Sequence, residues 1–570
     1  MTEQKTYTVA DAMIDVLKAH GVSTIFGYPG GAILPFYDAL PNHPEIKHIL
    51  TRHEQGAAFM AQGWARTTGQ IGVCCATSGP GATNLVTGIA DAHLDSIPML
   101  CITGQVPLTM IGKDMFQEVD MTGITMSITK HNYLVDKAEN IVPIMCEAIH
   151  LALRGRPGPV HIDVPKDIQA AEHPRDFEIP SFDFKDSNPY KQAYNEIPQE
   201  TIDQISKALL KANKPILLVG QGVKFAKAEN QLNELINKLG IPTVTTLLAK
   251  GIVDHNCPYY LGMLGMHGFY HANKAMHDAD LILNIGSRFD DRIVGRYDEF
   301  GKNAKIIHVD IDLCELGKVV ETDIPVHSDA KLFIEKLMGN LPPKLNIEDW
   351  WRDIHIWQQD KPYQTQTNSY TIRDAYYFIQ EEIKANPDQY IIVTDVGQHQ
   401  MWASLSCTVL KPEQWLSSGG SGTMGFALPT AIGAAFANPD KTILCLSGDG
   451  GIQMNIQELI LMRDHNLNVK CCILNNSFLG MVRQWQELFY GNNYSAVDMT
   501  SPDYIKLADA YGLKGVQAKN KSKAQKLTHK WLNNNKPVII EYVVEKEDNV
   551  FPMVPGGKTL GQTITSSNEQ

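Results

Sequence analysis

The sequence predicts an α/β protein made of three doubly wound parallel-sheet domains. Short apolar, β-branched runs alternate with helix-length segments along the whole chain. Such continuously apolar runs are typical of parallel sheets that helices cover on both faces. The chain also has 570 residues, which is more than one hydrophobic core usually supports. We therefore expect three blocks of about 150 to 190 residues, each the size of one doubly wound domain.

The expected strands fall into three groups. They cover residues 71–77, 99–103 and 160–164, then 216–219, 281–285 and 306–309, and finally 390–394, 442–446, 469–474 and 538–543. Two polar stretches rich in Pro and Asp, 172–198 and 341–366, are predicted to be linkers. The predicted domains are therefore 1–180, 190–340 and 367–550, followed by a C-terminal tail, 551–570. Ligands of such sheets bind at the carboxyl ends of the strands.

Composition and charge favour small-molecule chemistry. The net charge of −13 is spread along the chain without a basic cluster, which argues against a surface for nucleic acid or anionic membrane. The ten cysteines form no C-x-x-C pair and lie mostly in apolar runs, which favours buried thiols. The N-terminus lacks an apolar signal core, and no membrane span is recognisable. We therefore expect a cytoplasmic protein.

The segment from Gly448 to Asn476 has the features of a site for a magnesium-bound diphosphate. Gly448-Asp449-Gly450-Gly451 follows the expected strand 442–446, and Asn475-Asn476 ends the next strand. One right-handed crossover joins these strands, so Asp449 and Asn476 can be neighbours at one sheet edge. Mg²⁺ prefers hard oxygen ligands that it shares with phosphates. Glycines let the backbone approach a diphosphate, and the N-terminus of the next helix, patterned by Ile456, Leu459 and Ile460, favours its charge.

A Gly-Asp-Gly triplet alone is more often a simple strand-end turn than a cofactor site. The asparagine pair at the end of the next strand makes the cofactor site the better interpretation. The combination resembles the signature of the thiamine diphosphate enzyme superfamily, G-D-G followed after about 25 to 30 residues by N-N. By that resemblance Asp449, Asn476 and the carbonyl group of Phe478 bind Mg²⁺. The resemblance also implies contacts with thiamine diphosphate from Gly397, Gln398, His399, Gly422, Met424, Gly448, Gly450 and Gly451. Met424 matches the bulky residue that bends the cofactor.

A second motif of this superfamily lies near the N-terminus. The run from Arg52 to Ala58 contains Glu54 and is similar to the motif of the glutamate that bonds the pyrimidine N1′ atom and activates thiamine. Burial in an apolar setting raises the pKa of such a base, which suits proton sharing at neutral pH. Taken alone, Glu54 would more often be a solvated or ion-paired helix residue. Because Glu54 and Asp449 fall in domains that meet across a subunit interface in this superfamily, the resemblance implies a homodimer, and a tetramer stays open.

Further motifs narrow the resemblance over nearly the whole chain. They are residues 27–31, 116–118, 155–159, 288–292 and 551–555. Together they resemble the catalytic subunits of the acetohydroxyacid synthases, also called acetolactate synthases. These enzymes decarboxylate pyruvate and join the hydroxyethyl unit to a second pyruvate or to 2-ketobutyrate, in branched-chain amino acid biosynthesis. The resemblance therefore implies a pyrimidine domain, a central FAD-binding domain, a diphosphate domain and a small regulatory subunit as partner.

Trp485 and Arg292 are the residues that this resemblance assigns to the second ketoacid. A flat ring can favour an ethyl over a methyl group by about 1 to 3 kcal/mol. A guanidinium group matches a carboxylate with two parallel hydrogen bonds. Without a role in substrate binding, Trp485 would be a core tryptophan and Arg292 would form an ion pair with a neighbouring aspartate.

The remaining site residues are assigned by the resemblance alone, since composition does not single them out. Phe116, Met266, Met481 and Val482 are implied at the substrate, and Gly31, Gln117 and Lys166 in catalysis. Lys113-Asp114-Met115 departs from the family pattern, which leaves the packing near Phe116 open.

A flavin site is implied for the central domain. The expected strand 216–219 leads into Gly220-Gln221-Gly222, which resembles a dinucleotide turn but is weak evidence alone. The resemblance implies that FAD contacts Arg156, Gly220, Gly222, Thr246, Leu247, His267, Gly286, Arg288, Asp290, Arg292, Asp310 and Asp329. Asp310 follows a strand, a suitable place for an acid near a ribose. The flavin carries out no net redox step in this family.

Three alternative functions remain open at this point. A pyruvate oxidase of the same architecture would use its flavin for electron transfer, and Trp485 together with residues 288–292 speaks against it. A catabolic acetolactate synthase without FAD would depart from residues 288–292. A non-catalytic nucleotide-binding module would leave the joint presence of Glu54, Asp449 and Asn476 unexplained.

Overall fold

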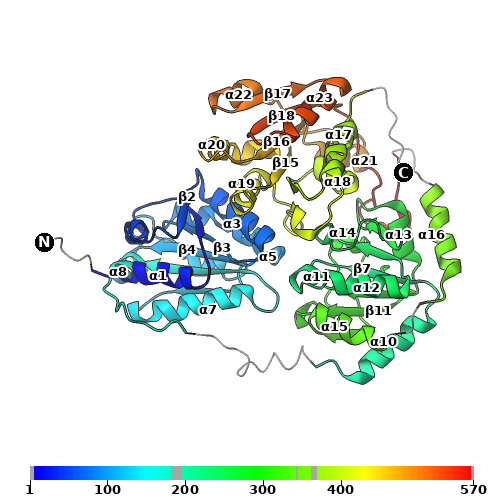
Figure 1. Cartoon of the computed structure of the whole chain (residues 1–570), viewed down its shortest axis with the longest axis horizontal. Helices are drawn as coiled ribbons and strands as arrows, with labels where there is room; N and C mark the ends of the chain where they lie inside the picture. The colour runs from blue at the N-terminus through cyan, green and yellow to red at the C-terminus, as the bar shows by residue number, and fades with distance from the viewer. Residues whose placement is uncertain (1–5, 181–195, 342–343, 361–368, 567–570) are drawn as a thin grey trace.

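Three six-stranded sheets, each flanked by helices, make up the molecule (Figure 1). The computed structural model describes residues 6–180, 196–341, 344–360 and 369–566. Neighbouring strands run parallel in all three sheets. The predicted fold class is therefore confirmed. Among the described residues, no helix combines the length and apolar character that crossing a membrane requires.

The N-terminal sheet has the order β2-β1-β3-β4-β6-β5. Its strands are β1 (Thr24–Gly27), β2 (Lys47–Leu50), β3 (Gly72–Ala76), β4 (Met99–Gln105), β5 (His131–Leu134) and β6 (Pro159–Pro165). Its longer helices are α1 (Val9–Ala19), α3 (Glu54–Thr68), α5 (Val86–Leu94) and α7 (Ile141–Leu153). β3, β4 and β6 are buried at every position, as the apolar runs predict.

The central sheet has the order β12-β11-β10-β7-β8-β9. Its strands are β7 (Pro215–Val219), β8 (Thr243–Thr245), β9 (Tyr260–Met263), β10 (Leu281–Ile285), β11 (Lys305–Asp310) and β12 (Ile324–His327). Its main helices are α10 (Gln199–Lys211), α11 (Gly222–Phe225), α12 (Glu229–Leu239), α13 (Tyr270–Asp278), α14 (Asp291–Val294) and α15 (Ala330–Met338). This strand order is that of dinucleotide-binding sheets, whose ligand lies where the order reverses. Here that point lies between β7 and β10.

The C-terminal sheet has the order β14-β13-β15-β16-β18-β17. Its strands are β13 (Tyr390–Thr394), β14 (Trp415–Ser417), β15 (Thr442–Gly448), β16 (Val469–Asn475), β17 (Lys514–Ala518) and β18 (Val538–Val543). Its helices include α17 (Ile372–Ala385), α18 (Gln398–Ser406), α19 (Ala427–Ala437), α20 (Leu459–Asp464), α21 (Gly480–Phe489), α22 (Tyr504–Ala510) and α23 (Lys521–Leu532). Counted along its own domain, this order repeats that of the N-terminal sheet, and its reversal point lies between β13 and β15.

Helices α3 and α19 join the N-terminal and C-terminal domains side by side (Figure 1). A Cβ atom added at Gly63 would lie 2.1 Å from the carbonyl oxygen of Thr430. One added at Gly433 would lie 2.0 Å from the carbonyl oxygen of Met60. Both glycines are therefore needed because the two helix backbones approach each other closely.

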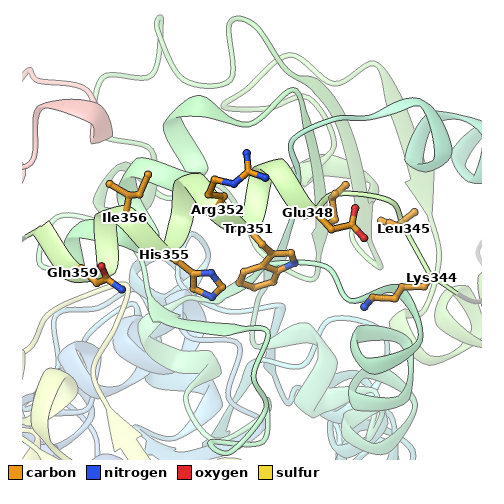
Figure 2. A pocket seen from close by; sticks show the side chains of 9 residues that line it. Lys344, Leu345, Glu348, Trp351, Arg352, His355, Ile356 and Gln359 are labelled. Atoms are coloured by element: carbon orange, nitrogen blue, oxygen red, sulfur yellow. The ribbon is translucent and has the colours of Figure 1, made fainter.

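The predicted linker 341–366 contains a helix, α16 (Glu348–Asp360), which corrects the linker prediction there. Trp350 and Ile354 are buried in the core of the central domain, and the Trp350 indole donates to the carbonyl oxygen of Pro215 at 3.2 Å. The polar composition concealed this helix because only one of its faces is apolar. Figure 2 shows Trp351 and His355 on one side of α16, beside a pocket of about 360 Å³. This pocket lies near the amino end of β7, away from the edge where ligands bind such sheets.

The C-terminal tail returns to the central domain. Val554 and Leu560 are each 2% exposed and belong to its hydrophobic core. The backbone amide of Val554 donates to the carbonyl oxygen of Met266 at 2.7 Å. The tail therefore closes over the loop that follows β9.

Candidate active site

Asp449 lies at the carboxyl end of β15, beside the reversal point of the C-terminal sheet. It is 1% exposed, and Ser501 Oγ donates to its Oδ2 atom at 3.2 Å. Its carbonyl oxygen accepts hydrogen bonds from Gln453 Nε2 at 2.8 Å and from the Tyr504 hydroxyl at 3.1 Å. Burial raises the pKa of Asp449 to about 6. A buried carboxylate of this kind gains stability from a nearby cation.

Asn476 follows β16, the strand beside β15, so the crossover brings it to the same edge. Its Nδ2 group donates to Gln398 Oε1 at 3.3 Å, and its Oδ1 atom accepts from the Phe478 amide at 3.2 Å. Ser477 between them has a φ of +57°, which turns the chain sharply at this point. In the described part of the chain, no three His, Cys, Asp or Glu side chains gather as a metal site. One carboxylate with amide and carbonyl oxygens is nevertheless a donor set that fits Mg²⁺.

A small cavity of about 90 Å³ brings most of the predicted diphosphate residues together. Its walls come from the ends of β13, β15 and β16 and from the start of α21. The predicted residues that line it are Gly397, Gln398, His399, Met424, Gly448, Asp449, Gly450, Gly451, Asn476, Phe478, Met481 and Val482. The Nε2 atom of the buried His399 has no hydrogen-bond partner there, so it is available to a ligand.

The predicted helix after Gly451 is only partly correct. A 3₁₀ segment, η7 (Gly451–Glu458), comes first, and α20 begins at Leu459. Asn455 interrupts the helical geometry with φ −131° and ψ 31°, and its side chain donates to the carbonyl oxygen of Gly425 at 2.8 Å. This tertiary contact outweighs the local helical pattern.

The run from Asp395 to His399 matches residues that touch the diphosphate in the family, but the Asp395 side chain has a different role in this structure. Its carboxylate is 1% exposed and accepts hydrogen bonds from the amides of Gly425 at 3.0 Å and Ala427 at 3.0 Å. It therefore holds the loop that carries Met424 rather than facing the cavity. No local pattern reveals this because the partners are about thirty residues away along the chain.

A larger cavity of about 600 Å³ lies where the central and C-terminal domains meet the N-terminal domain, which contributes Ser96 and Arg156 to its wall. Fifteen of the predicted flavin and substrate residues line it. They are Arg156, Gly222, Thr246, Leu247, Met266, His267, Gly286, Arg288, Asp290, Arg292, Asp310, Asp329, Met481, Val482 and Trp485. Gly397, Met424, Met481 and Val482 line both cavities, so the two cavities share walls. Gly422 lines the larger one alone.

Arg292, Trp485 and Met266 meet at one place in this larger cavity. The Arg292 guanidinium lies 5.6 Å from the centre of the Trp485 ring, and its Nη1 group is 3.2 Å from the Met266 sulfur. Arg292 is 53% exposed and lies 3.8 Å from Asp291, too far for a hydrogen-bonded ion pair. The charged group therefore stands over an aromatic face and stays available to an anionic ligand.

The central part of the cavity fits a dinucleotide. A Cβ atom added at Gly220 would lie 2.0 Å from the carbonyl oxygen of Gly286, so the turns after β7 and β10 touch. The buried Ser287 Oγ and His267 Nε2 atoms have no hydrogen-bond partner. Burial lowers the pKa of His267 to about 4, which keeps its ring neutral, and raises that of Asp310 to about 6. Unpaired polar atoms at the carboxyl edge of such a sheet suit a ribose-containing ligand.

Four predicted flavin residues also have structural partners. The Asp329 carboxylate accepts from the amides of Lys331 and Leu332 and caps α15. Asp290 caps α14 and pairs with Arg288 at 3.2 Å. Arg156 pairs with Asp312 at 3.1 Å and Glu315 at 2.7 Å.

The N-terminal residues gather at the reversal point of their own sheet. Glu54 is the first residue of α3, and its Oε2 atom accepts from Asn84 Nδ2 at 3.0 Å. Cβ atoms added at Gly79 and Gly81 would lie 2.8 Å from the Gln117 carbonyl oxygen and 3.2 Å from Glu54 Oε1. Glu54 and Gln117 therefore flank the turn after β3.

Glu54, Gln117 and four further predicted residues line neither of the two cavities within the described chain. The other four are Gly31, Phe116, Lys166 and Gly220. Phe116 is 87% exposed, in a loop where Asp114 and Gln117 both have positive φ. The structure of one chain thus holds two separate parts of the predicted site.

Comparison with known proteins is consistent with this architecture. Family models described as thiamine pyrophosphate enzyme, N-terminal TPP binding domain, central domain and C-terminal TPP binding domain match residues 7–124, 202–337 and 395–542. The chain is 43% identical to the acetolactate synthase isozyme 2 large subunit of Escherichia coli (strain K12), over 97% of this chain and 99% of that one. It is 42% identical to the acetolactate synthase large subunits of Cyanidium caldarium and Lactococcus lactis, over at least 96% of each chain.

Proposed function

Since the chain belongs to the thiamine pyrophosphate enzymes, and among them to the acetolactate synthase large subunits, we propose how its residues share the reaction. It forms acetolactate in branched-chain amino acid biosynthesis. The reaction takes two pyruvate molecules and one proton to acetolactate and CO₂. When bound, thiamine diphosphate supplies the nucleophilic carbon that this decarboxylation and ligation need.

Asp449, Asn476 and the carbonyl group of Phe478 would hold Mg²⁺ and, through it, the diphosphate. The raised pKa of Asp449 supports this assignment, because a buried carboxylate without a cation is costly. Gly448, Gly450 and His399 would line the diphosphate, and Met424 would shape the thiamine. Glu54 would share a proton with the pyrimidine N1′ atom.

The meeting of Arg292, Trp485 and Met266 is the observation that carries the assignment of the second ketoacid. Arg292 would bind its carboxylate, while the Trp485 ring and the Met266 thioether would contact its alkyl group. An ethyl group covers more of this apolar surface than a methyl group does. We therefore propose 2-ketobutyrate as an acceptor beside pyruvate.

The central domain would bind FAD. The Gly220–Gly286 contact, the unpaired Ser287 and His267 atoms and the cavity lining support it. Because the overall reaction neither oxidises nor reduces its substrates, the flavin supplies no net electron transfer. Its place here is to fill the cavity next to the substrate residues.

We further propose a homodimer in which the N-terminal domain of one subunit completes the site on the other. Glu54 and Gln117 lie away from the two cavities of their own chain, which supports this arrangement. A smaller subunit would be a further partner, since the relatives are named large subunits.

We also propose that the chain divides into the domains 1–180, 190–340 and 367–550 and that the protein is cytoplasmic. Nine of the ten free cysteines are buried, which fits a reducing compartment.

Product analysis tests this function directly. The purified protein, supplied with pyruvate, thiamine diphosphate and Mg²⁺, should form acetolactate, with a flavin absorbance retained by the protein. Glu54→Gln should lower turnover by at least about a hundred-fold, in the range expected for loss of acid–base catalysis, while the fold is kept. Acetyl phosphate or peroxide as the product, or near-normal turnover of the variant, would contradict the proposal.

A further inference from the structure

Three charged side chains of the N-terminal domain form a buried cluster beneath the glycine-rich loop 417–425. Arg66 comes from α3, Asp91 lies in α5, and Asp95 directly follows α5. They are 5%, 0% and 2% exposed. The Arg66 Nη2 group lies 2.8 Å from Asp95 Oδ2 and 3.5 Å from Asp91 Oδ2.

This cluster bonds five of the seven loop positions from Ser417 to Thr423. The Asp95 carboxylate accepts from the amides of Gly419 at 3.0 Å and Gly420 at 2.7 Å. Asp91 Oδ1 accepts from the Ser418 hydroxyl and from Thr423 Oγ1, the latter at 2.8 Å. Arg66 Nη1 donates to the carbonyl oxygen of Ser417 at 3.2 Å.

The residues of this loop do little on their own to restrict its conformation. Three of the seven residues from 417 to 423 are glycines, which lose the most conformational freedom on ordering. Yet this loop separates the cofactor sites, since Gly419, Gly420 and Gly422 line the larger cavity and Met424 lines both. Its position must therefore be fixed from outside. Asp395 binds its end at Gly425, Gln400 binds Ser417 and Ser418 at its start, and the charged cluster binds the residues between them.

We propose that Arg66, Asp91 and Asp95 are positioning residues for the thiamine diphosphate site, because they hold the loop from which Met424 reaches the cofactor. The inference rests on the proposed function, since it takes the small cavity as the diphosphate site. None of the three lines that cavity, so their influence acts through the loop. Residues that orient the groups in contact with a ligand commonly change its affinity ten- to a hundred-fold when replaced.

Asp95→Asn is the first test, in the full-length protein. One amide would lose its acceptor, and Arg66 would keep its hydrogen bonds to Gln62 and Ser417 but only the more distant Asp91 as an ion-pair partner. We expect the Kd for thiamine diphosphate, measured with Mg²⁺ by quenching of tryptophan fluorescence, to rise about ten-fold. The KM for the cofactor should rise likewise while kcat at saturating cofactor stays near that of the wild type, and bound flavin should be lost more readily on gel filtration.

Thr423→Val is the second test, in case breaking a buried ion pair prevents folding. It removes only the hydroxyl that donates to Asp91, and we expect a roughly five-fold weaker Kd, as for one lost hydrogen bond. Asp464→Asn is the control, since it removes a different pair between the same domains, with Arg52 at 3.2 Å, and leaves the loop untouched. It should bind thiamine diphosphate like the wild type.

The outcomes separate this inference from the proposed function. A wild-type protein that fails to bind thiamine diphosphate overturns the proposed function. Wild-type binding together with unchanged Kd in folded Asp95→Asn and in Thr423→Val overturns the positioning role alone. An equal loss of affinity in Asp464→Asn overturns it too, since the effect would then come from the domain contact in general.

Discussion

Trp485 and Arg292 set the expected choice between acceptor substrates. In Trp485→Leu the flat surface beneath the Arg292 guanidinium is lost, together with the contact area for an ethyl group. We expect the preference for 2-ketobutyrate over pyruvate to fall by about ten-fold or more, since one methylene contact is worth about 1 to 3 kcal/mol. The product ratio in a competition between the two ketoacids measures this.

Trp531→Leu is the matched control. This tryptophan lies in α23 and packs against the core of the C-terminal domain, away from both cavities. It should reduce stability and leave the product ratio unchanged. A ratio that stays the same in Trp485→Leu would remove the tryptophan from the specificity assignment.

We expect the unfolding free energy of the N-terminal domain to depend on pH because of Asp163. It is 1% exposed, and burial raises its pKa from 3.8 to about 7. Between these two values the folded protein binds more protons than the unfolded chain, so the stability falls as the pH rises. The slope is at most about 1.4 kcal/mol per pH unit.

Replacing Asp163 by Asn should therefore flatten the decline of unfolding free energy between about pH 5 and pH 7, as urea titrations would show. Thr103 Oγ1 and Gln105 Nε2, its partners at 2.6 and 2.8 Å, can still bond an amide. Asp349→Asn, at a side chain 90% exposed, should keep the wild-type slope. A wild-type slope in Asp163→Asn would show that this carboxyl group is ionised in the folded protein.

Single residues could be predicted from the sequence where the chemistry follows a strand directly. Asp449 and Asn476 end neighbouring parallel strands, so their proximity follows from the local pattern and one crossover. Asp395 also follows a strand, but its bonds to the loop that carries Met424 could not be predicted, and Arg66 and Asp95 gave no signal at all. Their partners lie in distant parts of the chain, and a buried carboxylate that holds a loop looks in sequence like any strand-end or helix-end acid.

At the scale of elements, the contact between α3 and α19 is sensitive to a single methyl group. Gly433→Ala would place a Cβ atom 2.0 Å from the Met60 carbonyl oxygen, which forces the helices apart. We expect a loss of about 1 to 3 kcal/mol in unfolding free energy, even though alanine favours a helix by about 1 kcal/mol over glycine. Thermal unfolding measures it.

Gly556→Ala is the control for this substitution, since nothing lies within 4 Å of its added Cβ atom. It should leave the melting temperature within experimental error of the wild type. Equal stability of Gly433→Ala and the wild type would mean that the two helices can separate without cost.

Elements were predictable where their pattern was uniform and less so where tertiary contacts decide. The apolar strand runs at 390–394 and 469–474 coincide with β13 and most of β16. In contrast, α16 was hidden by its polar outer face, and Asn455 breaks the expected helix through its bond to Gly425. The periodicity of a sequence indicates which face of a segment is buried. The α16 helix and the break at Asn455 depend instead on which distant segment each one contacts.

For the whole molecule, the division of the site between subunits can be tested by complementation. Glu54→Gln and Asp449→Asn subunits should each be inactive, but a mixed dimer would contain one site with both native residues. Co-expression should therefore restore about a quarter of the wild-type activity, since half the dimers are mixed and half their sites intact. Turnover per total subunit measures this.

Each variant expressed alone serves as the control and should stay inactive. Co-expression without recovery, for subunits that do form mixed dimers, would place Glu54 and Asp449 in the same chain's site. The number of domains followed from chain length and strand spacing. Strand order did not, because it depends on packing between segments far apart in the chain, and the separation of Glu54 from Asp449 was implied by the resemblance alone.

The shared strand order of the first and third sheets points to a common origin. A gene segment that was copied and then diverged would leave two units of one topology on either side of an unrelated one. The ancestral dimer would have been formed by identical copies, and each would now keep half of the original crevice. One copy would have acquired Glu54 after its second strand, the other Asp449 after its third. Superposing residues 24–165 on 390–543 strand by strand, against the central domain as reference, tests this descent.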